Sequence, residues 1–346
     1  MRKRIAVCYP QVPFEYGGIE LQVDTLVEKL EQSGYSACSV SLPYKWYPND
    51  VLLDNVAAWR MVDLTQAEGQ PIDAVICVKF PAYVVQHPRK IVWLAHQYRQ
   101  VYDLFGRPGG LPDTEENRLL QGALKRIDYT SLSEAVHIFT ISQNVRNRLL
   151  HYNEIDSEVL YLPIANEEQY HAVDYGDYVL SVGRLDPLKR TDLLVEAFRY
   201  VRSGARCLIA GDGVQREHLE SMIRRYGLDQ KVSLLGRLPF PKLLGLYAGA
   251  LAVYYAPIDE DYGLVTVEAF KSGRPVITAH DSGGVLEFTR DGETGCVVSP
   301  EPEQIAAAVD LLFENRSLAE RYGQAGRELV TNINWDYALE RLKAYL

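Results

Sequence analysis

The sequence predicts an α/β fold in which two parallel sheets are each wound with helices on both faces. Short apolar runs that read as buried strands alternate with segments whose apolar residues recur at helical spacing, as is typical of parallel sheets joined through helices. A polar stretch, residues 163–177, interrupts this alternation, which then starts afresh. At 346 residues the chain has the length of two domains rather than one.

The first half opens with an apolar run, residues 5–9, followed by a loop that contains two adjacent glycines. Residues 19–33 are predicted to be a helix, because apolar residues repeat there at i, i+3, i+4 and i+7 and Gly34 supplies a stop. Residues 41–60 and 103–113 are expected to be irregular, and either to cover a binding cleft or simply to lie on the surface. Further strands are expected at 74–78, 91–95 and 136–141, and helices near 115–129 and 143–151.

The second half repeats the same alternation after the polar stretch. A last helix, residues 335–346, is expected either to pack back on the first domain or to be buried within the second. These boundaries predict an N-terminal domain of residues 1–165 and a C-terminal domain of residues 176–334. Strands are expected at 178–182, 207–210, 232–235, 251–255 and 276–278, and helices at 191–201, 217–226, 242–248, 264–270 and about 302–329.

Composition narrows the possible function classes. The formal net charge is −10, which argues against nucleic acid as the main partner, because neutralising phosphates requires a concentrated basic face. No run of 18 or more apolar residues exists, so no membrane-spanning helix is expected. The five cysteines are scattered without a C-x-x-C pair and are read as buried small side chains in a reducing compartment. Residues 5–9 are too short for the core of a signal peptide, so we expect a cytoplasmic protein.

An acidic loop after the apolar run 251–255 is the strongest candidate for the chemistry. Glu260 lies in this loop and Glu268 lies eight residues further on, inside the predicted helix, so both carboxylates can face one crevice. The start of that helix presents backbone N–H groups and a positive dipole end, which suit a phosphate. Carboxylates for sugar hydroxyls beside amides for phosphate describe a nucleotide-sugar site. The residues expected to supply the amide end are Tyr262, Gly263, Leu264 and Val265.

A second candidate is the loop after the strand at 178–182. Gly183 permits a tight turn there, and Arg184 and Lys189 can converge on an anion, the arginine through two parallel hydrogen bonds and the lysine as a point charge. The alternative is a solvated basic loop that caps the next helix. The phosphate interpretation is favoured because this loop and the Glu260 loop both follow strands of one predicted parallel sheet.

The first domain offers two weaker candidates. Gly17 and Gly18 follow the first strand at a helix start, where their amides could reach a diphosphate. His96 closes the strand at 91–95, at the edge where open α/β sheets bind ligands, although a lone histidine is often structural. Neither half contains a G-x-G-x-x-G fingerprint with a downstream acidic residue, which argues against a nicotinamide or flavin dehydrogenase.

A metal site is not expected. Asp259, Glu260 and Asp261 have the D-x-D form that some sugar transferases use to hold a divalent ion against a diphosphate. Here Arg184, Lys189 and a helix start could already neutralise that diphosphate, and the histidines show no metal-ligand spacing.

With these residues in view, the whole chain resembles the retaining GT-B glycosyltransferases of family 4. The segment 260–270 matches the E-G-F-G-L-x-x-x-E-A signature, with Asp261 where glycine is commoner. Arg184 and Lys189 match the phosphate-binding pair of the family, although Arg190 replaces the glycine that usually follows the lysine. The adjacent glycines at the start of the 19–33 helix and the histidine after the 91–95 strand also fall where the family has its glycine loop and a histidine near the donor sugar.

The resemblance implies two Rossmann-like domains that face each other across a cleft, with the acceptor bound mainly by the first and the nucleotide-sugar donor by the second. It implies no cofactor and no metal. It also implies retention of the anomeric configuration, which we expect to proceed by attack on the same face, with the leaving phosphate taking the acceptor's proton. The implied roles are diphosphate binding by Arg184 and Lys189, assisted by Gly18 and the amides at Gly263 and Leu264, ribose binding by Glu268, and contacts with the transferred sugar by Glu260 and His96.

The sequence leaves the acceptor open among a glycan, a lipid-linked and a small-molecule hydroxyl. Aromatic residues of the first half, such as Trp46 and Tyr47, fit stacking on sugar rings as well as plain packing. A thin basic patch that includes Lys125 and Arg126 is consistent with weak contact with the inner face of a membrane. Two other functions stay possible, a GT-B-type nucleotide-sugar 2-epimerase and a non-catalytic subunit that binds a nucleotide or glycan.

Overall fold

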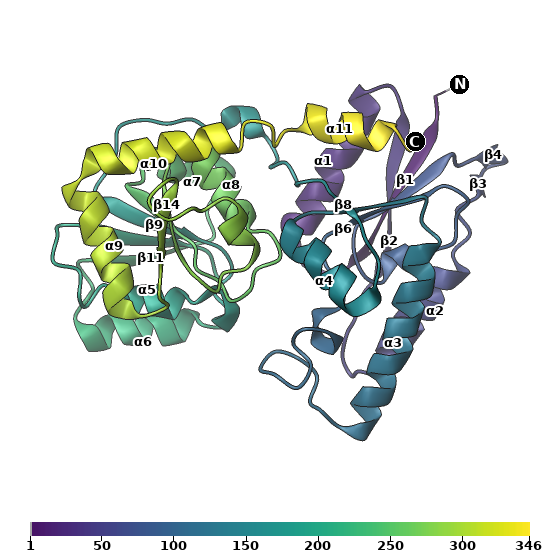
Figure 1. Cartoon of the computed structure of the whole chain (residues 1–346), viewed down its shortest axis with the longest axis horizontal. Coiled ribbons are helices and arrows are strands. Elements are labelled where there is room, and N and C mark those ends of the chain that lie inside the picture. Colours follow the sequence, from purple (N-terminus) through teal and green to yellow (C-terminus); the bar gives the residue numbers. More distant parts are fainter. Residues whose placement is uncertain (1) are drawn as a thin grey trace. The chain divides into compact units, whose positions relative to one another are not determined.

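The computed structural model describes residues 2–346 and divides them into two compact units. The first unit comprises the residues up to Ala165 together with Trp335–Leu346, and the second comprises Asn166–Asn334. Figure 1 shows each unit as a sheet with helices packed against it.

A parallel six-stranded sheet forms the centre of the first unit, with the strand order β2-β1-β5-β6-β7-β8. Its middle strands β5 and β6 are buried at every position, as expected for strands covered on both faces. A two-stranded antiparallel hairpin, β3 (Gln66–Ala67) and β4 (Gln70–Pro71), lies apart from it. The strands of the main sheet are β1 (Arg4–Gln11), β2 (Ser36–Pro43), β5 (Ala74–Cys77), β6 (Lys90–Leu94), β7 (His137–Thr140) and β8 (Glu158–Val159).

Side-chain caps define the starts of two helices in this unit. The Thr114 and Ser142 hydroxyls accept hydrogen bonds from backbone N–H groups in the first turns of α3 and α4. The helices are α1 (Gly18–Gln32), α2 (Val51–Met61), α3 (Glu115–Ser133), α4 (Gln143–Asn153) and α11 (Trp335–Lys343), with short 3₁₀ turns η1 (Ala82–Val84) and η2 (Arg99–Val101).

One sequence prediction about this unit was wrong, and two of its strands, β2 and β8, were not predicted. Residues 41–60, expected to be irregular, contain the end of β2 and most of α2. The helix buries Leu52, Val56 and Trp59 on one face, a helical spacing that the surrounding prolines and aromatic residues obscured in the sequence. The second expected loop, residues 103–113, contains no helix or strand.

The second unit is also built on a parallel six-stranded sheet, with the order β11-β10-β9-β12-β13-β14. The direction of winding reverses at β9, whose neighbours are β10 and β12, and ligands of open α/β sheets bind outside the carboxyl ends of the strands at such a reversal. The strands are β9 (Tyr178–Val182), β10 (Arg206–Ala210), β11 (Val232–Gly236), β12 (Ala252–Tyr254), β13 (Val276–Ala279) and β14 (Gly295–Val298).

The elements of this unit depart from the sequence prediction at two points, one in the helices and one in the strands. The helix expected at about 302–329 is broken at Asn315, whose extended backbone (φ −121°, ψ 71°) ends α9 and precedes α10. The strand β14 was not predicted at all. The helices are α5 (Thr191–Ala197), α6 (Arg216–Tyr226), α7 (Phe240–Gly249), α8 (Leu264–Lys271), α9 (Pro302–Glu314) and α10 (Arg316–Leu329), with 3₁₀ turns η3 (Glu167–Gln169), η4 (Pro187–Lys189) and η5 (Gly284–Glu287).

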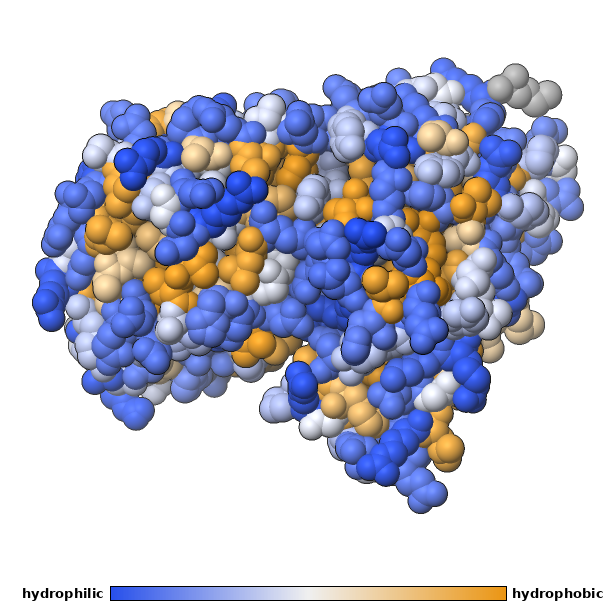
Figure 2. Space-filling view, in the orientation of Figure 1, coloured by the Kyte–Doolittle hydropathy of each residue, from blue (hydrophilic) through white to orange (hydrophobic). Residues whose placement is uncertain are grey.

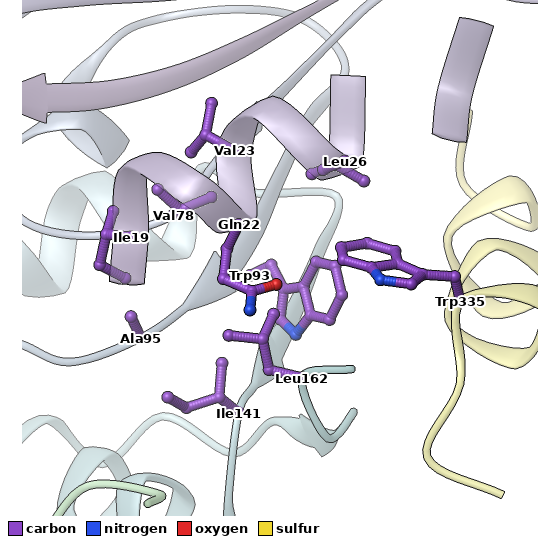
Figure 3. A pocket seen from close by; sticks show the side chains of 10 residues that line it. All are labelled: Ile19, Gln22, Val23, Leu26, Val78, Trp93, Ala95, Ile141, Leu162 and Trp335. Atoms are coloured by element: carbon purple, nitrogen blue, oxygen red, sulfur yellow. The ribbon is translucent and has the colours of Figure 1, made fainter. Parts of the chain in front are cut away.

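The final helix, α11, is part of the first unit although the chain reaches it from the second. The Trp335 ring is buried, donates from Nε1 to the Ile164 carbonyl at 3.1 Å and packs edge-on against Trp93. Both rings line a small apolar cavity of about 20 Å³ under α1. Figure 3 shows Gln22 extending from α1 into this group of side chains, and its buried Oε1 has no hydrogen-bond partner.

Within residues 2–346, no helix combines the length and the apolar character needed to cross a bilayer. On the face shown in Figure 2, apolar residues are interspersed with polar ones over both units.

Candidate functional site

The candidate site of the second unit lies where the strand order reverses. The β9 and β12 strands are paired in register, with Tyr254 opposite Ser181, so the loops that follow them leave the same edge of the sheet side by side. The loop after β9 contains η4 and Lys189, and the loop after β12 carries Glu260 and leads into α8.

Lys189 and Glu260 form an ion pair at the centre of this edge. Lys189 Nζ lies 2.5 Å from Glu260 Oε2 and donates a hydrogen bond to the Tyr255 hydroxyl at 3.1 Å. Burial lowers the pKa of Lys189, but Tyr255 and Glu260 outweigh this effect and leave the pKa above its ordinary value. The structure therefore holds a charged ammonium group next to a carboxylate.

Arg184 occupies a different environment in the same loop. Its side chain is 81% exposed, and its closest acidic partner is Asp186, at 3.8 Å. The backbone around it is fixed, because the Leu185 N–H donates to the Asp212 carbonyl in the next loop. Arg184 is thus an exposed cation on an anchored loop, whereas Lys189 is a largely buried one.

The start of α8 presents backbone amides at the same edge. Its N-cap residue is Gly263, in the left-handed region at φ 89°, and no side chain caps the first turn. A Cβ at Gly263 would lie 2.9 Å from a Val285 methyl group and 3.1 Å from the Tyr255 ring, so glycine is required there. The first-turn residues include Leu264 and Val265, where a helix of this kind favours an anion.

Glu268 lies one turn further along α8 and is held by tyrosines. The Tyr247 hydroxyl of α7 donates to Glu268 Oε2 at 2.5 Å, and the Tyr170 ring packs against Tyr247. Burial raises the pKa of Glu268, and hydrogen bonds from Tyr247 and Tyr170 partly offset that rise. A carboxylate in this position can accept further hydrogen bonds from a ligand's hydroxyl groups.

The candidates of the first unit lie at the carboxyl edge of its own sheet. Gly17 precedes α1, and its N–H donates to Glu20 Oε2 at 2.9 Å, while Gly18 is the first residue of the helix. His96 follows β6, and its Nδ1 lies 2.6 Å from the Gln97 carbonyl, which orients the ring.

Comparison with known proteins identifies the family. The sequence profile described as "Glycosyl transferases group 1" matches residues 165–329, nearly the whole second unit. Residues 165–329 thus form a group 1 glycosyl transferase domain. This finding confirms the resemblance recognised from Glu260, Glu268, Arg184 and Lys189, all of which lie inside the matched segment.

Curated relatives match the chain over part of their length. An uncharacterized glycosyltransferase of Methanocaldococcus jannaschii, MJ1607, is 27% identical over 263 residues, which are 69% of this chain and 66% of that protein. The D-inositol 3-phosphate glycosyltransferase of Nocardia farcinica is 33% identical over 175 residues, 47% of this chain and 39% of the relative. The chain thus spans less than two thirds of the length of these relatives.

Solved structures of similar fold cover almost the entire chain. The Anabaena protein Alr3699/HepE, in complex with UDP and glucose, has a TM-score of 0.71 and 15% identity, covering 99% of each chain. Sucrose-phosphate synthase from Thermosynechococcus elongatus has a TM-score of 0.78 and 19% identity, covering 99% of this chain and 98% of that one. The predicted GT-B fold class, with two helix-flanked parallel sheets, is confirmed.

Several partners of the charged residues in the candidate site were not predicted from the sequence. Tyr255 was interpreted only as part of an apolar run, Tyr247 as part of the predicted helix 242–248, and Tyr170 as part of a linker. The sequence analysis noted Arg190 only as a departure from the family pattern, and it did not consider Asp281 as a site residue. The position of Tyr255 directly before the acidic loop was the one available signal.

The acidic loop has no metal-ligand geometry in the part of the chain that the structure describes. No three His, Cys, Asp or Glu side chains of residues 2–346 are grouped so that they could hold a metal ion. Within the D-x-D segment, Glu260 is instead paired with Lys189.

Proposed function

We propose that the chain is a retaining, metal-independent glycosyltransferase that moves a sugar from a nucleotide-diphosphate sugar to an acceptor hydroxyl. The observation that carries the proposal is the grouping of Lys189, Glu260 and Glu268 around the start of α8, with Arg184 on the neighbouring loop. Cations and helix amides suit a diphosphate, and carboxylates suit the hydroxyls of ribose and sugar.

Donor binding in this proposal exchanges one partner of Lys189 for another. Without a ligand the ammonium group is balanced by Glu260. A diphosphate brings more negative charge than a carboxylate, so Lys189 and Arg184 stabilise it and the charge that grows on it as the glycosidic bond breaks. Glu260 is then available to the hydroxyls of the transferred sugar, and Glu268 to those of the ribose.

The proposed reaction takes place on one face of the sugar. The acceptor oxygen forms a bond to the anomeric carbon while the bond from that carbon to the phosphate oxygen breaks, and the leaving phosphate takes the acceptor's proton. No carboxylate acts as a covalent nucleophile, since Glu260 is the only one assigned to the transferred sugar and its role is hydrogen bonding. For Gly17, Gly18 and His96 of the first unit, roles in binding the donor rest on the sequence resemblance.

The proposed acceptor is a hydroxyl of a glycan, a lipid-linked or a small molecule, in the synthesis of a cell-surface glycan. A small acceptor is supported by the name of one relative, D-inositol 3-phosphate glycosyltransferase, which includes a small phosphorylated polyol. Exposed Trp46 and Tyr47, which pack edge-to-face, offer rings on which a sugar could stack. A lipid-linked acceptor would bring the protein to the inner face of a membrane.

Turnover with a panel of donors tests the proposal. UDP-glucose is the first donor to use, since the similar Anabaena protein is known in complex with it. We expect transfer from one of the UDP-, GDP-, ADP- or TDP-sugars to an added glycan acceptor, undiminished in excess EDTA. Conversion of the donor without any acceptor would instead indicate an epimerase, and binding without turnover a non-catalytic subunit. A glycosyl–protein adduct detected by mass spectrometry would contradict the same-face mechanism.

A further inference from the structure

Arg190, the residue that departs from the family pattern, joins three loops of the second unit. Its Nε donates to the Ala256 carbonyl at 2.7 Å and its Nη2 to the Pro257 carbonyl at 2.9 Å, both in the loop that carries Glu260. The same guanidinium group forms two hydrogen bonds to the Asp281 carboxylate, at 2.6 and 2.9 Å, in the loop after β13. Only a planar, forked donor can make all four bonds at once.

The backbone of Arg190 adopts a conformation that an L-residue rarely accepts. It lies in the left-handed region (φ 50°, ψ 40°), where a side chain costs about 1 kcal/mol relative to glycine. Its carbonyl accepts a hydrogen bond from the buried Tyr254 hydroxyl at 3.0 Å. A glycine would adopt this conformation without strain, so the arginine side chain must offset that cost through its contacts.

Backbone hydrogen bonds extend the same connection toward the candidate site. The Ile258 N–H donates to the Leu188 carbonyl at 2.8 Å, and the Asp259 N–H donates to the Asp281 carbonyl at 2.9 Å. The Glu260 N–H donates to the Ser282 carbonyl at 3.2 Å. The segment that carries Glu260 is therefore tied on one side to the Lys189 loop and on the other to the Asp281 loop.

We propose that Arg190 and Asp281 form a clamp that sets the position of Glu260 relative to Lys189, and that both are positioning residues for the transferred sugar. The inference rests on the proposed function, because it assigns the clamp to the same site. The geometry supports it: Lys189 adjoins Arg190 in the chain, and the clamp holds the two residues that begin the Glu260 loop. The departure from glycine at this position is thus a functional feature of the site.

The Asp281 carboxyl group stays ionised at neutral pH, so the ion pair with Arg190 is maintained there. Burial raises the pKa of Asp281, but hydrogen bonds and charge from Arg190 outweigh this and leave the pKa below its ordinary value. Because the pKa is lower in the folded state, the ion pair contributes fully to folding stability above the ordinary carboxyl pKa. This contribution is lost only as the pH falls through the lower, folded-state pKa. The Arg190–Asp281 contact is therefore formed under assay conditions near neutral pH.

Substitution of either partner tests the clamp. R190M and D281N remove the paired bonds, and R190G also removes the backbone strain. The matched control is R316M, because Arg316 likewise donates to two carbonyls, those of Tyr175 and Gly176, and to a carboxylate, Asp177, elsewhere in the unit. The readouts are kcat and KM for the donor sugar, UDP affinity, and hydrogen exchange of the amides at 258–260.

We expect R190M, R190G and D281N to lower kcat/KM by about 10- to 100-fold and to speed hydrogen exchange of the amides at 258–260. UDP affinity should change less than 3-fold in these variants. The control R316M should change neither kcat/KM nor the exchange at 258–260. The double variant R190M/D281N should be no worse than either single one, because both remove the same contact. Full activity in R190G, or an equal loss in R316M, would overturn the proposal. If the wild-type protein transfers no sugar at all, the proposed function fails, while unchanged exchange at 258–260 in R190M would separately refute the clamp.

Discussion

At the scale of single residues, the charged side chains of the site differ in whether they are already paired with an opposite charge in the structure without a ligand. Lys189 and Glu260 are each about four-fifths shielded from solvent and neutralise one another, with Tyr255 completing the environment of the lysine. Arg184 is mostly exposed. A diphosphate would therefore meet an exposed cation, Arg184, and a largely buried one, Lys189, that must exchange its partner.

Removing the buried cation is expected to abolish most of the activity. K189M should lower kcat by about 10²- to 10³-fold, the usual effect of losing one preorganised group that stabilises transition-state charge. K242M, at an exposed lysine of the same unit, is the control and should leave the rate unchanged. Initial rates with the preferred donor provide the measurement, and a K189M rate within 3-fold of wild type would contradict the assigned role.

The tyrosine contact with Glu268 predicts a pH dependence of nucleotide affinity. The Tyr247 hydrogen bond lowers the pKa of Glu268 against the raising effect of burial, so Y247F should raise that pKa further. In the proposed donor complex the carboxylate form of Glu268 accepts hydrogen bonds from the ribose hydroxyls. UDP affinity should therefore fall as the pH drops through the pKa of Glu268, and this fall should begin at higher pH in Y247F.

Calorimetric titration of UDP between pH 5 and 8 measures this shift. A loss of about 2- to 10-fold in affinity at the lower end is expected for Y247F, the range of one hydrogen bond. The control is Y178F, which removes a hydroxyl that donates only to the Leu246 carbonyl. Parallel pH profiles for Y247F and wild type would count against a ribose-binding role of Glu268.

The charged residues of the site were visible in the sequence, whereas their partners were not. Glu260, Glu268, Arg184 and Lys189 stand out because their residue types and spacings match a known signature next to strand ends. The bond between Arg190 and Asp281 joins residues 91 positions apart, and no local pattern marks the two as partners. Which hydroxyl or guanidinium group reaches a carboxylate depends on the packing of loops, which a single sequence does not encode locally.

At the scale of elements, a buried carboxylate joins α3 of the first unit to η1 and to the residue that follows η2. Asp128 is fully buried and accepts hydrogen bonds from Tyr83 at 2.8 Å and from Tyr102 at 2.6 Å. Burial raises its pKa from 3.8 to about 7, although both tyrosine hydrogen bonds act in the opposite direction. The carboxyl group therefore titrates near neutrality in the folded protein.

This raised pKa predicts that stability falls with rising pH. Since the folded-state value exceeds the unfolded one, the contribution of Asp128 is fully present below about pH 4 and is lost as the pH rises toward 7, by roughly 4 kcal/mol in all. Urea midpoints at pH 4 to 7 should show wild type declining relative to D128N. The control D24N removes an exposed carboxylate that Tyr16 contacts. A constant difference between wild type and D128N would disprove the buried titration.

Most elements of both sheets were predictable because buried parallel strands read as short apolar runs. The failures have physical reasons. The α2 helix lies between prolines and aromatic residues that suggested a loop, and the short strand β14 follows a turn-rich segment. The break at Asn315 separates two helices that share one apolar periodicity, so the sequence read them as one.

At the scale of the whole molecule, the chain enters the first unit twice. The α11 helix returns to it after the second unit, and Trp335 fills the space beside Trp93. W335A is expected to destabilise the first unit by ~3 to 5 kcal/mol, the usual cost of truncating a buried aromatic residue. Y337A, at a half-exposed position on the same helix, is the control. Thermal unfolding monitored by tryptophan fluorescence measures the difference, and equal midpoints for the two variants would contradict this role.

Binding of nucleotide sugars tests the central claim most directly, because it requires no knowledge of the acceptor. The measurement is the thermal stability of the wild-type protein and of K189M and E268Q, each with UDP, GDP, ADP and TDP and their sugars. We predict that one nucleotide series stabilises the wild-type protein, by about 2.7 kcal/mol at roughly 100 times its Kd, and that both variants lose most of this effect. No stabilisation by any nucleotide sugar, or equal stabilisation of all three proteins, would contradict the account.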